Sequence, residues 1–151
     1  MTNQKTFISV PIIIHFGDTD PYGVVYFASY FRYCHHGIEA FFKTLGLPPH
    51  RYFRNTDKGF GLPVVDASCK FTRPVWYGEE LELRVLINSL KEKSITFGFQ
   101  FYHAGTSEQV AEGEATIVAI GRDWRARSLP NDLREAVEQF LKSGDCPRRA
   151  S

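Results

Sequence analysis

The sequence predicts an α+β fold, in which one curved antiparallel sheet packs around a single long helix. Three observations lead to this prediction: an apolar strand near the start of the chain, a long helical pattern after it, and four alternating segments that follow one another closely. Short turns join antiparallel neighbours, so a doubly wound parallel sheet is excluded. The chain has 151 residues, the length of one ordinary domain, and we expect residues 1–151 to form that domain.

The first two elements differ in the period of their apolar residues. A strand is expected over Phe7–Phe16, where β-branched and aromatic residues dominate. From Val25 to Leu45 the apolar residues recur every three or four positions, which predicts an amphipathic helix of about five turns. Gly46 and the Pro48-Pro49 pair end this pattern. Gly37 costs helix stability, so its position predicts a close approach to the sheet.

Four further strands are expected, because apolar and polar residues alternate there with a period of two. These strands span Val65–Thr72, Leu81–Ile87, Ile95–Phe101 and Val110–Ile120. One face of the last strand carries mostly small side chains, which would let a helix lie close. The small residues are Ala111, Gly113, Ala115 and Ala119. A short helix over Pro130–Ser143 completes the order, and residues 143–151 are expected to form a frayed tail.

Composition excludes several classes of function. Lys and Arg total 18 and Asp and Glu total 17, so the basic excess of a general nucleic-acid binder is absent. No apolar run approaches the roughly 18 residues of a membrane span. The three cysteines are odd in number and widely spaced, which predicts neither a disulfide framework nor a zinc site and favours a reduced, cytoplasmic protein. Aromatic residues reach 15%, which indicates an aromatic-rich core or pocket.

The best candidate for chemistry lies between the first strand and the long helix, where Asp18 and Asp20 stand two residues apart. A helix start offers free backbone N–H groups and a positive dipole end, which could polarise a carbonyl oxygen as it gains charge. A nearby carboxylate could then attack the carbonyl carbon or take a proton from water. The plainer interpretation is that both aspartates only cap the helix and shape the turn, and spacing alone favours it.

The stretch Phe16–Phe31 resembles the signature of the 4-hydroxybenzoyl-CoA thioesterase family, which has the hotdog fold. The shared features are an aromatic residue before Asp-x-Asp, a Pro and a Gly, two hydrophobic residues, aromatic residues and then Ser-Tyr. The likeness continues through Leu45–Pro49 and Gly61–Val65 and along the strands to about Ile120, with the same element order. The resemblance implies metal-free hydrolysis of acyl-CoA thioesters, and it favours a functional Asp20 over the turn-only interpretation.

The resemblance also implies roles for single residues. The family's catalytic carboxylate, which acts as nucleophile or general base, falls on Asp20. The helix-start N–H that polarises the thioester carbonyl falls on Phe27, and Asp18 then shapes the turn. Short-chain acyl relatives carry His where this chain has Phe27, whereas the aryl-CoA branch has an aromatic residue. The implied substrate is therefore an aromatic acyl-CoA, similar to 4-hydroxybenzoyl-CoA, or a short-chain acyl-CoA.

Further positions match parts of the family that contact substrate. The positions implied to bind the substrate are Tyr22, Gly23, Val24, His35 and Pro63, of which His35 would face the acyl pocket. For His35 the alternative is a surface or packing histidine. The turn with Lys91, Lys93 and Ser94 aligns with a basic turn that holds CoA phosphates in the aryl-CoA branch, although Glu92 interrupts the basic pattern. A solvated turn with no binding role is the alternative there.

His35, His36 and Glu39 lie at helical spacings that could make a metal site. The family uses no metal, and no other cluster of ligands is evident in the sequence. We therefore expect no metal and no cofactor, since coenzyme A is part of the substrate.

Two other functions are compatible with a hotdog fold. A non-catalytic acyl-CoA or acyl-carrier binding protein would have no need of a carboxylate such as Asp20. A hotdog dehydratase would need a histidine paired with a carboxylate, and only His15 is close to Asp20 in sequence. The expected partners are an acyl-CoA substrate and further copies of the chain, in a dimer or a tetramer, with no nucleic acid and no membrane. A single long helix cannot cover both faces of the sheet, so the uncovered face and the sheet edges need another subunit, which is why we expect an oligomer.

Overall fold

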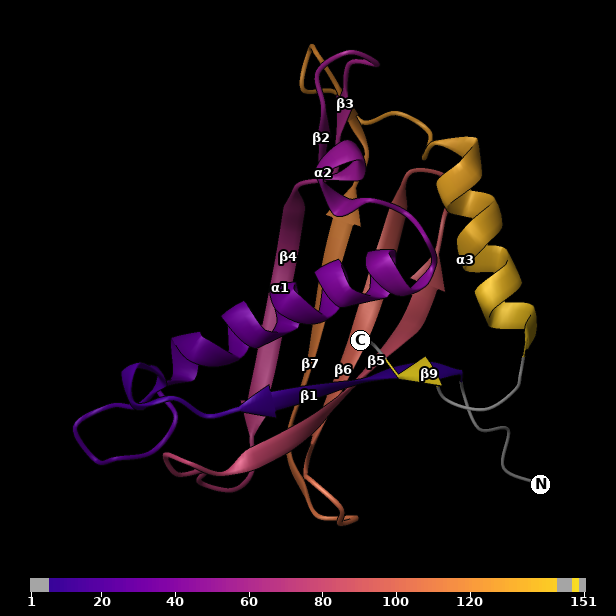
Figure 1. The fold of residues 1–151 in the computed structure, drawn as a ribbon. Helices are drawn as coiled ribbons and strands as arrows, with labels where there is room; N and C mark the ends of the chain where they lie inside the picture. The colour runs from indigo at the N-terminus through magenta and orange to yellow at the C-terminus, as the bar shows by residue number, and fades with distance from the viewer. Residues whose placement is uncertain (1–5, 144–147, 150–151) are drawn as a thin grey trace.

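The structure is a computed structural model, and it describes residues 6–143 and 148–149 (Figure 1). In chain order the strands and helices are β1 Phe7–Ile13, the 3-10 helix η1 Phe16–Asp18, α1 Phe27–Thr44, α2 Pro49–Tyr52, β2 Arg54–Asn55, β3 Phe60–Gly61, β4 Val64–Phe71, β5 Glu80–Leu90, β6 Ser94–His103, β7 Gln109–Val118, β8 Ile120–Gly121, α3 Asn131–Ser143 and β9 Arg148–Arg149. The α+β class and the order of the expected elements are confirmed.

One six-stranded sheet has the order β4-β7-β6-β5-β1-β9. Its neighbours pair antiparallel except for β1 and β9, which pair parallel. The second sheet is small and has the order β2-β3-β8. No helix of the described residues is both long enough and apolar enough to cross a membrane.

Aromatic residues of β6 stand opposite small residues of β7 on the face that α1 covers. Phe97, Phe99 and Phe101 pair in register with Ala115, Gly113 and Ala111. All three phenylalanines are buried, so the small partners leave room for the helix above them.

The packing at Gly37 of α1 confirms the expected close approach to the sheet. A Cβ atom added there would lie 2.9 Å from Cδ2 of Leu83 and 3.0 Å from Cγ2 of Val85. The helix α3 lies on the same side of the sheet, where the rings of Phe140 and Phe41 have centroids 5.0 Å apart. Both helices therefore cover one face, and the other face is left open (Figure 1).

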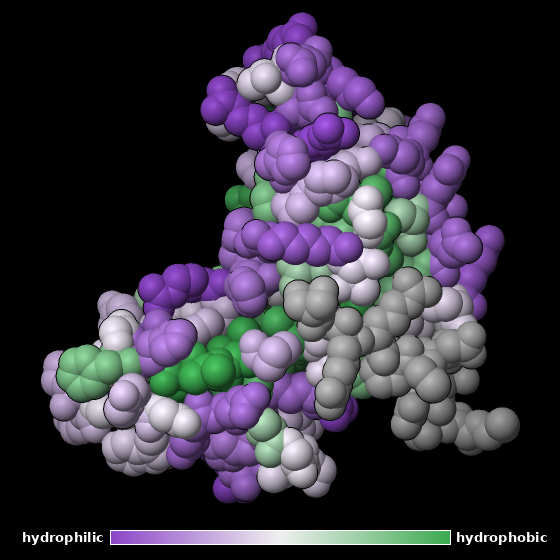
Figure 2. All heavy atoms as spheres, in the orientation of Figure 1, coloured by the Kyte–Doolittle hydropathy of each residue, from purple (hydrophilic) through white to green (hydrophobic). Residues whose placement is uncertain are grey.

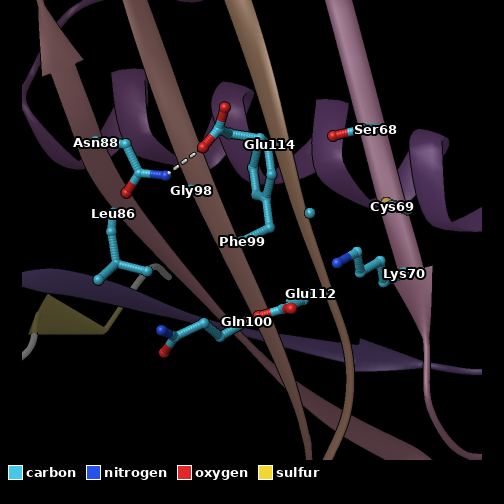
Figure 3. A pocket seen from close by; sticks show the side chains of 11 residues that line it. Ser68, Cys69, Lys70, Leu86, Asn88, Gly98, Phe99, Gln100, Glu112 and Glu114 are labelled. Atoms are coloured by element: carbon cyan, nitrogen blue, oxygen red, sulfur yellow. Dashed lines mark hydrogen bonds between the residues drawn. The ribbon is translucent and has the colours of Figure 1, made fainter.

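The open face of the sheet is mostly polar. A hollow of about 320 Å³ lies there. Figure 3 shows Lys70, Gln100 and Glu112 among the side chains that line it. In the same hollow Asn88 Nδ2 donates a hydrogen bond to Glu114 Oε2 at 3.0 Å. A polar face of an antiparallel sheet can meet water without a partner. The open face therefore gives no physical reason to expect a second subunit. The exposed edge strand β4 is the stronger reason to expect an oligomer.

Several boundaries differ from those predicted, and three of these differences have a clear structural cause. β1 ends at Ile13 rather than Phe16, because the backbone there turns into η1. α1 begins at Phe27 rather than Val25, because Val25 donates its N–H to the carbonyl of Val75 at 2.8 Å in an extended segment. The last strand is broken at Ala119, whose N–H is bonded to the carbonyl of Lys93 at 2.9 Å, so that β8 joins the small sheet instead.

The segment between α1 and β4 contains structure that the sequence did not reveal. Pro49 starts the short helix α2, where a proline is well tolerated because the first N–H has no partner in a helix. The strands β2 and β3 then form a small hairpin over Arg54–Gly61. Of the expected tail, Arg148–Arg149 form β9, and most of the remainder lies outside the described residues.

Candidate active site

The loop between β1 and α1 is held together by Asp18. Its carboxylate accepts hydrogen bonds from Nη2 of Arg32 at 2.5 Å and from the backbone N–H of His15 at 3.1 Å. Its carbonyl oxygen accepts from the N–H of Tyr26 at 2.8 Å and from the hydroxyl of Ser29 at 3.0 Å. Asp18 is buried and ties the loop to the first two turns of α1, which agrees with the structural role that the sequence suggested.

Asp20 opens a tight turn in the same loop. Its Oδ1 accepts a hydrogen bond from the N–H of Tyr22 at 2.8 Å, and its carbonyl accepts from the N–H of Gly23 at 2.8 Å. Pro21 sets the backbone angle at the second position of this turn, and Gly23 supplies a φ of 85°. Within the described residues, Oδ2 of Asp20 has no hydrogen-bond partner. The turn therefore fixes the half-buried carboxylate and leaves one of its oxygens available.

The start of α1 has no capping side chain. Its N-cap residue is Tyr26, no side-chain hydrogen bond caps it, and no acidic residue lies in its first turn. The N–H of Phe27, the first helical residue, has no backbone acceptor in the part of the chain that the structure describes. The interpretation that the two aspartates cap this helix is therefore wrong. What remains is a free N–H group at the positive end of a helix of 18 residues.

A hollow of about 310 Å³ lies beside this helix start. Its walls are largely apolar and include Val24, Phe27, Tyr30 and Phe71. The rings of Tyr30 and Phe71 have centroids 4.9 Å apart, and burial, followed by the charges of Cys69 and Glu79, raises the pKa of Tyr30 to about 12. The tyrosine therefore keeps its proton at neutral pH. Figure 2 shows apolar surface on this side of the molecule, where β1 ends and α1 begins.

The turn carries three residues that were expected to bind substrate, and the structure places them in different surroundings. Val24 lines the hollow, whereas Tyr22 points outward with 87% of its surface exposed. Gly23 lies against the ring of Trp76, because a Cβ added to it would be 3.5 Å from that ring. Trp76 was not singled out in the sequence, although its position after a strand and before Gly78 indicated a turn.

His35 and Pro63 lie away from this hollow. The ring of His35 has its centroid 5.5 Å from that of Phe53, and Phe53 and Pro63 both line a second cavity, at the small sheet of β2, β3 and β8. Glu39 pairs with Nζ of Lys43 at 3.2 Å. Among the residues that the structure describes, no three His, Cys, Asp or Glu side chains come together as ligands for a metal ion.

The turn between β5 and β6 is anchored to the start of α3. Nη2 of Arg134 donates to the carbonyls of Lys91 and Glu92 at 2.6 and 2.7 Å, and the hydroxyl of Ser128 donates to Oε1 of Glu92 at 3.0 Å. Glu92, which interrupts the basic pattern, is therefore a structural residue of this turn. Lys91 and Lys93 are exposed, and neither forms an ion pair with another described residue.

This turn and the Asp20 loop lie at opposite ends of the molecule (Figure 1). An α1 of 18 residues is about 27 Å long, and the two sites lie beyond its opposite ends. A single chain thus brings Asp20, Val24 and the N–H of Phe27 into one region, and it places Pro63, Lys91 and Lys93 in another.

Residues 14–137 of the chain match the model of the thioesterase-like superfamily. The chain belongs to the thioesterase-like superfamily. A 1,4-dihydroxy-2-naphthoyl-CoA hydrolase from Synechococcus sp. (strain WH7803) is 34% identical over 150 residues, which cover 95% of this chain and 94% of that protein. A hydrolase of the same name from Rippkaea orientalis (strain PCC 8801 / RF-1) is 32% identical over 131 residues, covering 86% of this chain and 91% of that protein.

Solved structures of thioesterases share the fold of this thioesterase-like protein. A 1,4-dihydroxy-2-naphthoyl-CoA thioesterase from Synechocystis has a TM-score of 0.81 and 23% identity, covering 87% of this chain and 95% of that one. A gentisyl-coenzyme A thioesterase has a TM-score of 0.75 and 27% identity, covering 85% and 98%. The protein is an enzyme of the thioester hydrolase class, as predicted. The curated relatives quoted above are named for a naphthoyl-CoA, and not for 4-hydroxybenzoyl-CoA.

In this thioesterase-like protein, sequence reasoning missed one residue that the site depends on. Arg32 holds the carboxylate of Asp18, and so the loop that carries Asp20. Arg32 follows Ser29 by three positions, which places both on one face of the helix, and its Nη2 also donates to Oγ of Ser29 at 3.2 Å. The sequence did contain a signal for this contact. A basic residue stands near the start of a helix that follows a loop with two acidic residues.

Proposed function

We propose that the protein hydrolyses the thioester bond of an aromatic acyl-CoA and releases the free acid and CoA. The observation that carries this proposal is the pairing of Asp20, whose Oδ2 is left available by its turn, with the uncapped start of α1 that follows in the same loop. A carboxylate and an N–H donor are the two groups that thioester hydrolysis without a metal requires.

In the proposed mechanism the N–H of Phe27 donates a hydrogen bond to the thioester carbonyl oxygen. Negative charge develops on that oxygen as the carbon is attacked, and the positive end of α1 stabilises it. Asp20 acts in one of two ways. Its carboxylate takes a proton from the water that attacks the carbonyl carbon, or it attacks that carbon itself and forms a mixed anhydride, which water then hydrolyses. In both cases the C–S bond breaks, and the CoA thiolate leaves and takes up a proton.

The shape of the hollow beside Phe27 supports an aromatic acyl group. The rings of Tyr30 and Phe71 and the side chain of Val24 offer flat, apolar walls against which an aromatic ring can pack. Relatives that cover most of this chain are named for a substrate with two fused rings. We therefore propose a hydroxylated fused-ring acyl group, as in 1,4-dihydroxy-2-naphthoyl-CoA, ahead of the single ring of 4-hydroxybenzoyl-CoA.

We also propose that the enzyme works as a dimer or a larger assembly built on β4. This strand is one edge of the sheet, and its eight residues are almost all exposed, including Val64, Val65 and Phe71. An exposed apolar edge strand invites pairing with another strand. Two copies that pair antiparallel through β4 about a two-fold axis would place the Asp20 loop of one copy beside the Pro63 end of the other.

A panel of acyl-CoA substrates with detection of the released thiol tests the proposal. We expect 1,4-dihydroxy-2-naphthoyl-CoA and 4-hydroxybenzoyl-CoA to be hydrolysed at least about tenfold more efficiently than acetyl-CoA. Fastest release from acetyl-CoA would reject the aromatic substrate. Binding of every acyl-CoA without release of thiol would show a non-catalytic binding protein. The dehydratase alternative has little structural support, because the histidine next to this loop, His15, has its Nδ1 4.0 Å from Asp18 and is largely exposed.

A further inference from the structure

Cys34 and Cys69 stand 35 positions apart in the sequence, and the fold brings their sulfur atoms to 3.9 Å from each other. Cys34 lies in the middle of α1, and Cys69 lies on the edge strand β4, where Figure 3 labels it. Both thiols are free; Cys34 is buried, whereas Cys69 is only partly buried. The proposed chemistry of the Asp20 loop uses neither thiol, so the pair needs an explanation of its own.

The neighbouring strand β7 makes room for the two thiols. Gly113 pairs in register with Cys69. A Cβ atom added to Gly113 would lie 2.7 Å from Sγ of Cys69 and 3.7 Å from Sγ of Cys34. Glycine inside a strand weakens the strand and often marks a place where another group approaches closely. Here the glycine preserves the close approach of the two sulfur atoms, because any side chain would collide with the sulfur of Cys69.

The two thiols differ in acidity and in access to solvent. The hydrogen bond with Cys34 lowers the pKa of the Cys69 thiol, while the same hydrogen bond and burial raise the pKa of Cys34. The thiolate is the reactive form of cysteine, and Cys69 is also the more exposed of the two. Cys69 is therefore the sulfur that reacts first with an oxidant from solvent, and Cys34 is placed to react second.

The thiol pair lies next to the aromatic wall of the hollow beside Phe27. Cys34 follows Tyr30 by four positions, so both lie on one face of α1. Cys69 precedes Phe71 by two positions, so both lie on one face of β4. The rings of Tyr30 and Phe71 line the hollow, with their centroids 4.9 Å apart. A change in the distance between the two sulfur atoms therefore changes the spacing of α1 and β4 close to these rings.

We propose that Cys34 and Cys69 form a reversible oxidation site, which closes to an intrachain disulfide and narrows the hollow that receives the acyl group. The oxidant is hydrogen peroxide. The thiolate of Cys69 attacks one peroxide oxygen, the O–O bond breaks, and the leaving hydroxide takes up a proton, which gives a sulfenic acid and water. The sulfur of Cys34 then attacks the sulfur of Cys69; the S–S bond forms, the S–O bond breaks, and the proton of Cys34 leaves with the hydroxide as a second water. The two sulfurs lose two electrons, and a thiol reductant returns them.

Closing the disulfide requires movement beside the hollow. The sulfur atoms of a disulfide are about 2.05 Å apart, so the two sulfurs must approach each other by about 1.9 Å. Rotation of the side chains and a shift of α1 toward β4 share this movement. The shift narrows the space in front of Tyr30 and Phe71, where the aromatic acyl group of the proposed substrate packs. This second part of the inference rests on the proposed function, and the oxidation site itself does not.

The first test needs no substrate. Treatment with hydrogen peroxide should lower the mass of the intact chain by two hydrogen atoms, and peptide mapping should find Cys34 joined to Cys69. A thiol reductant should restore the mass. Cys146→Ser removes the third cysteine and should behave as the wild type, whereas Cys34→Ala should gain oxygen at Cys69 instead. Absence of the Cys34–Cys69 link, or a link between Cys69 residues of two chains, would overturn the inference.

The second test measures KM before and after oxidation. Oxidation should raise KM for the aromatic acyl-CoA about fivefold, as expected for the loss of about one aromatic contact, and should leave KM for acetyl-CoA nearly unchanged. A thiol reductant should reverse the rise, and Cys34→Ala should show none. An unchanged KM in a protein that carries the disulfide would refute the link to the hollow. A reversible disulfide in a protein that hydrolyses no acyl-CoA would uphold the oxidation site and reject the proposed function.

Discussion

Replacing Asp18 with Ala should loosen the loop that carries Asp20. The change removes two hydrogen bonds, one from Arg32 at 2.5 Å and one from the N–H of His15 at 3.1 Å. A hydrogen bond to a charged partner contributes about 1.5–3 kcal/mol, and a neutral one about 1 kcal/mol. The side chain of Arg32 is 63% exposed, so solvent screening reduces the first figure to about 1 kcal/mol. The free energy of unfolding should therefore fall by about 2 kcal/mol.

Urea unfolding at a fixed protein concentration measures this loss, and a double-mutant cycle with Arg32→Ala isolates the pair. We expect a coupling energy of about 1 kcal/mol between the two side chains. Turnover should also fall, because the loop no longer fixes Asp20, but by less than when Asp20 itself is changed. Asp18→Asn, which keeps the size of the side chain, should lose less turnover than Asp18→Ala. A stable Asp18→Ala protein with full turnover would refute the reasoning that Asp18 holds the loop.

Three further predictions concern binding, metal and assembly. Charge reversal at Lys91 and Lys93 should raise KM for acyl-CoA more than it lowers kcat, because phosphate contacts are the same in the ground and transition states, and the effect should shrink with added salt. Lys142→Glu on α3 is the matched control, and a pantetheine substrate should not respond to the reversal. Dialysis against a chelator should leave turnover unchanged; a loss that zinc restores would point to His35, His36 and Glu39. Sedimentation should show a dimer or tetramer at micromolar concentration, and a stable monomer of 17.3 kDa would contradict the β4 interface.

Much of the fold could be predicted because the spacing of apolar residues and the residues typical of turns depend only on neighbours in the sequence. The alternation of residues 95–101 and the helical spacing of residues 27–44 each depend on neighbours in sequence, and both elements are found there. The break at Ala119 could not be predicted in this way. It depends on hydrogen bonds from Ala119 to Lys93 and from Arg127 to Ala119, which join segments that only the tertiary structure brings together.

The same distinction applies to the candidate site. Asp20 and Phe27 stand close in sequence, so their shared loop and helix start were visible in the sequence pattern. Arg32 was missed because its link to Asp18 spans 14 positions and depends on how the loop folds back. The distance between the Asp20 loop and the Lys91 turn could not be inferred either, since it follows from the direction of α1 across the sheet (Figure 1).

Replacement of Asp20 by Asn tests most directly whether this carboxylate performs the chemistry. Asn keeps the size of the side chain, and its oxygen can still accept the hydrogen bond from Tyr22, so the fold and the affinity for acyl-CoA should persist. Loss of the nucleophile or base should lower turnover at least about a hundredfold, which corresponds to about 2.7 kcal/mol of barrier. The measurement is kcat of the folded variant on the best aromatic acyl-CoA, alongside its binding of that substrate. A variant that keeps more than about a third of wild-type turnover would contradict the account, and Asp20 would then be only a residue of the turn.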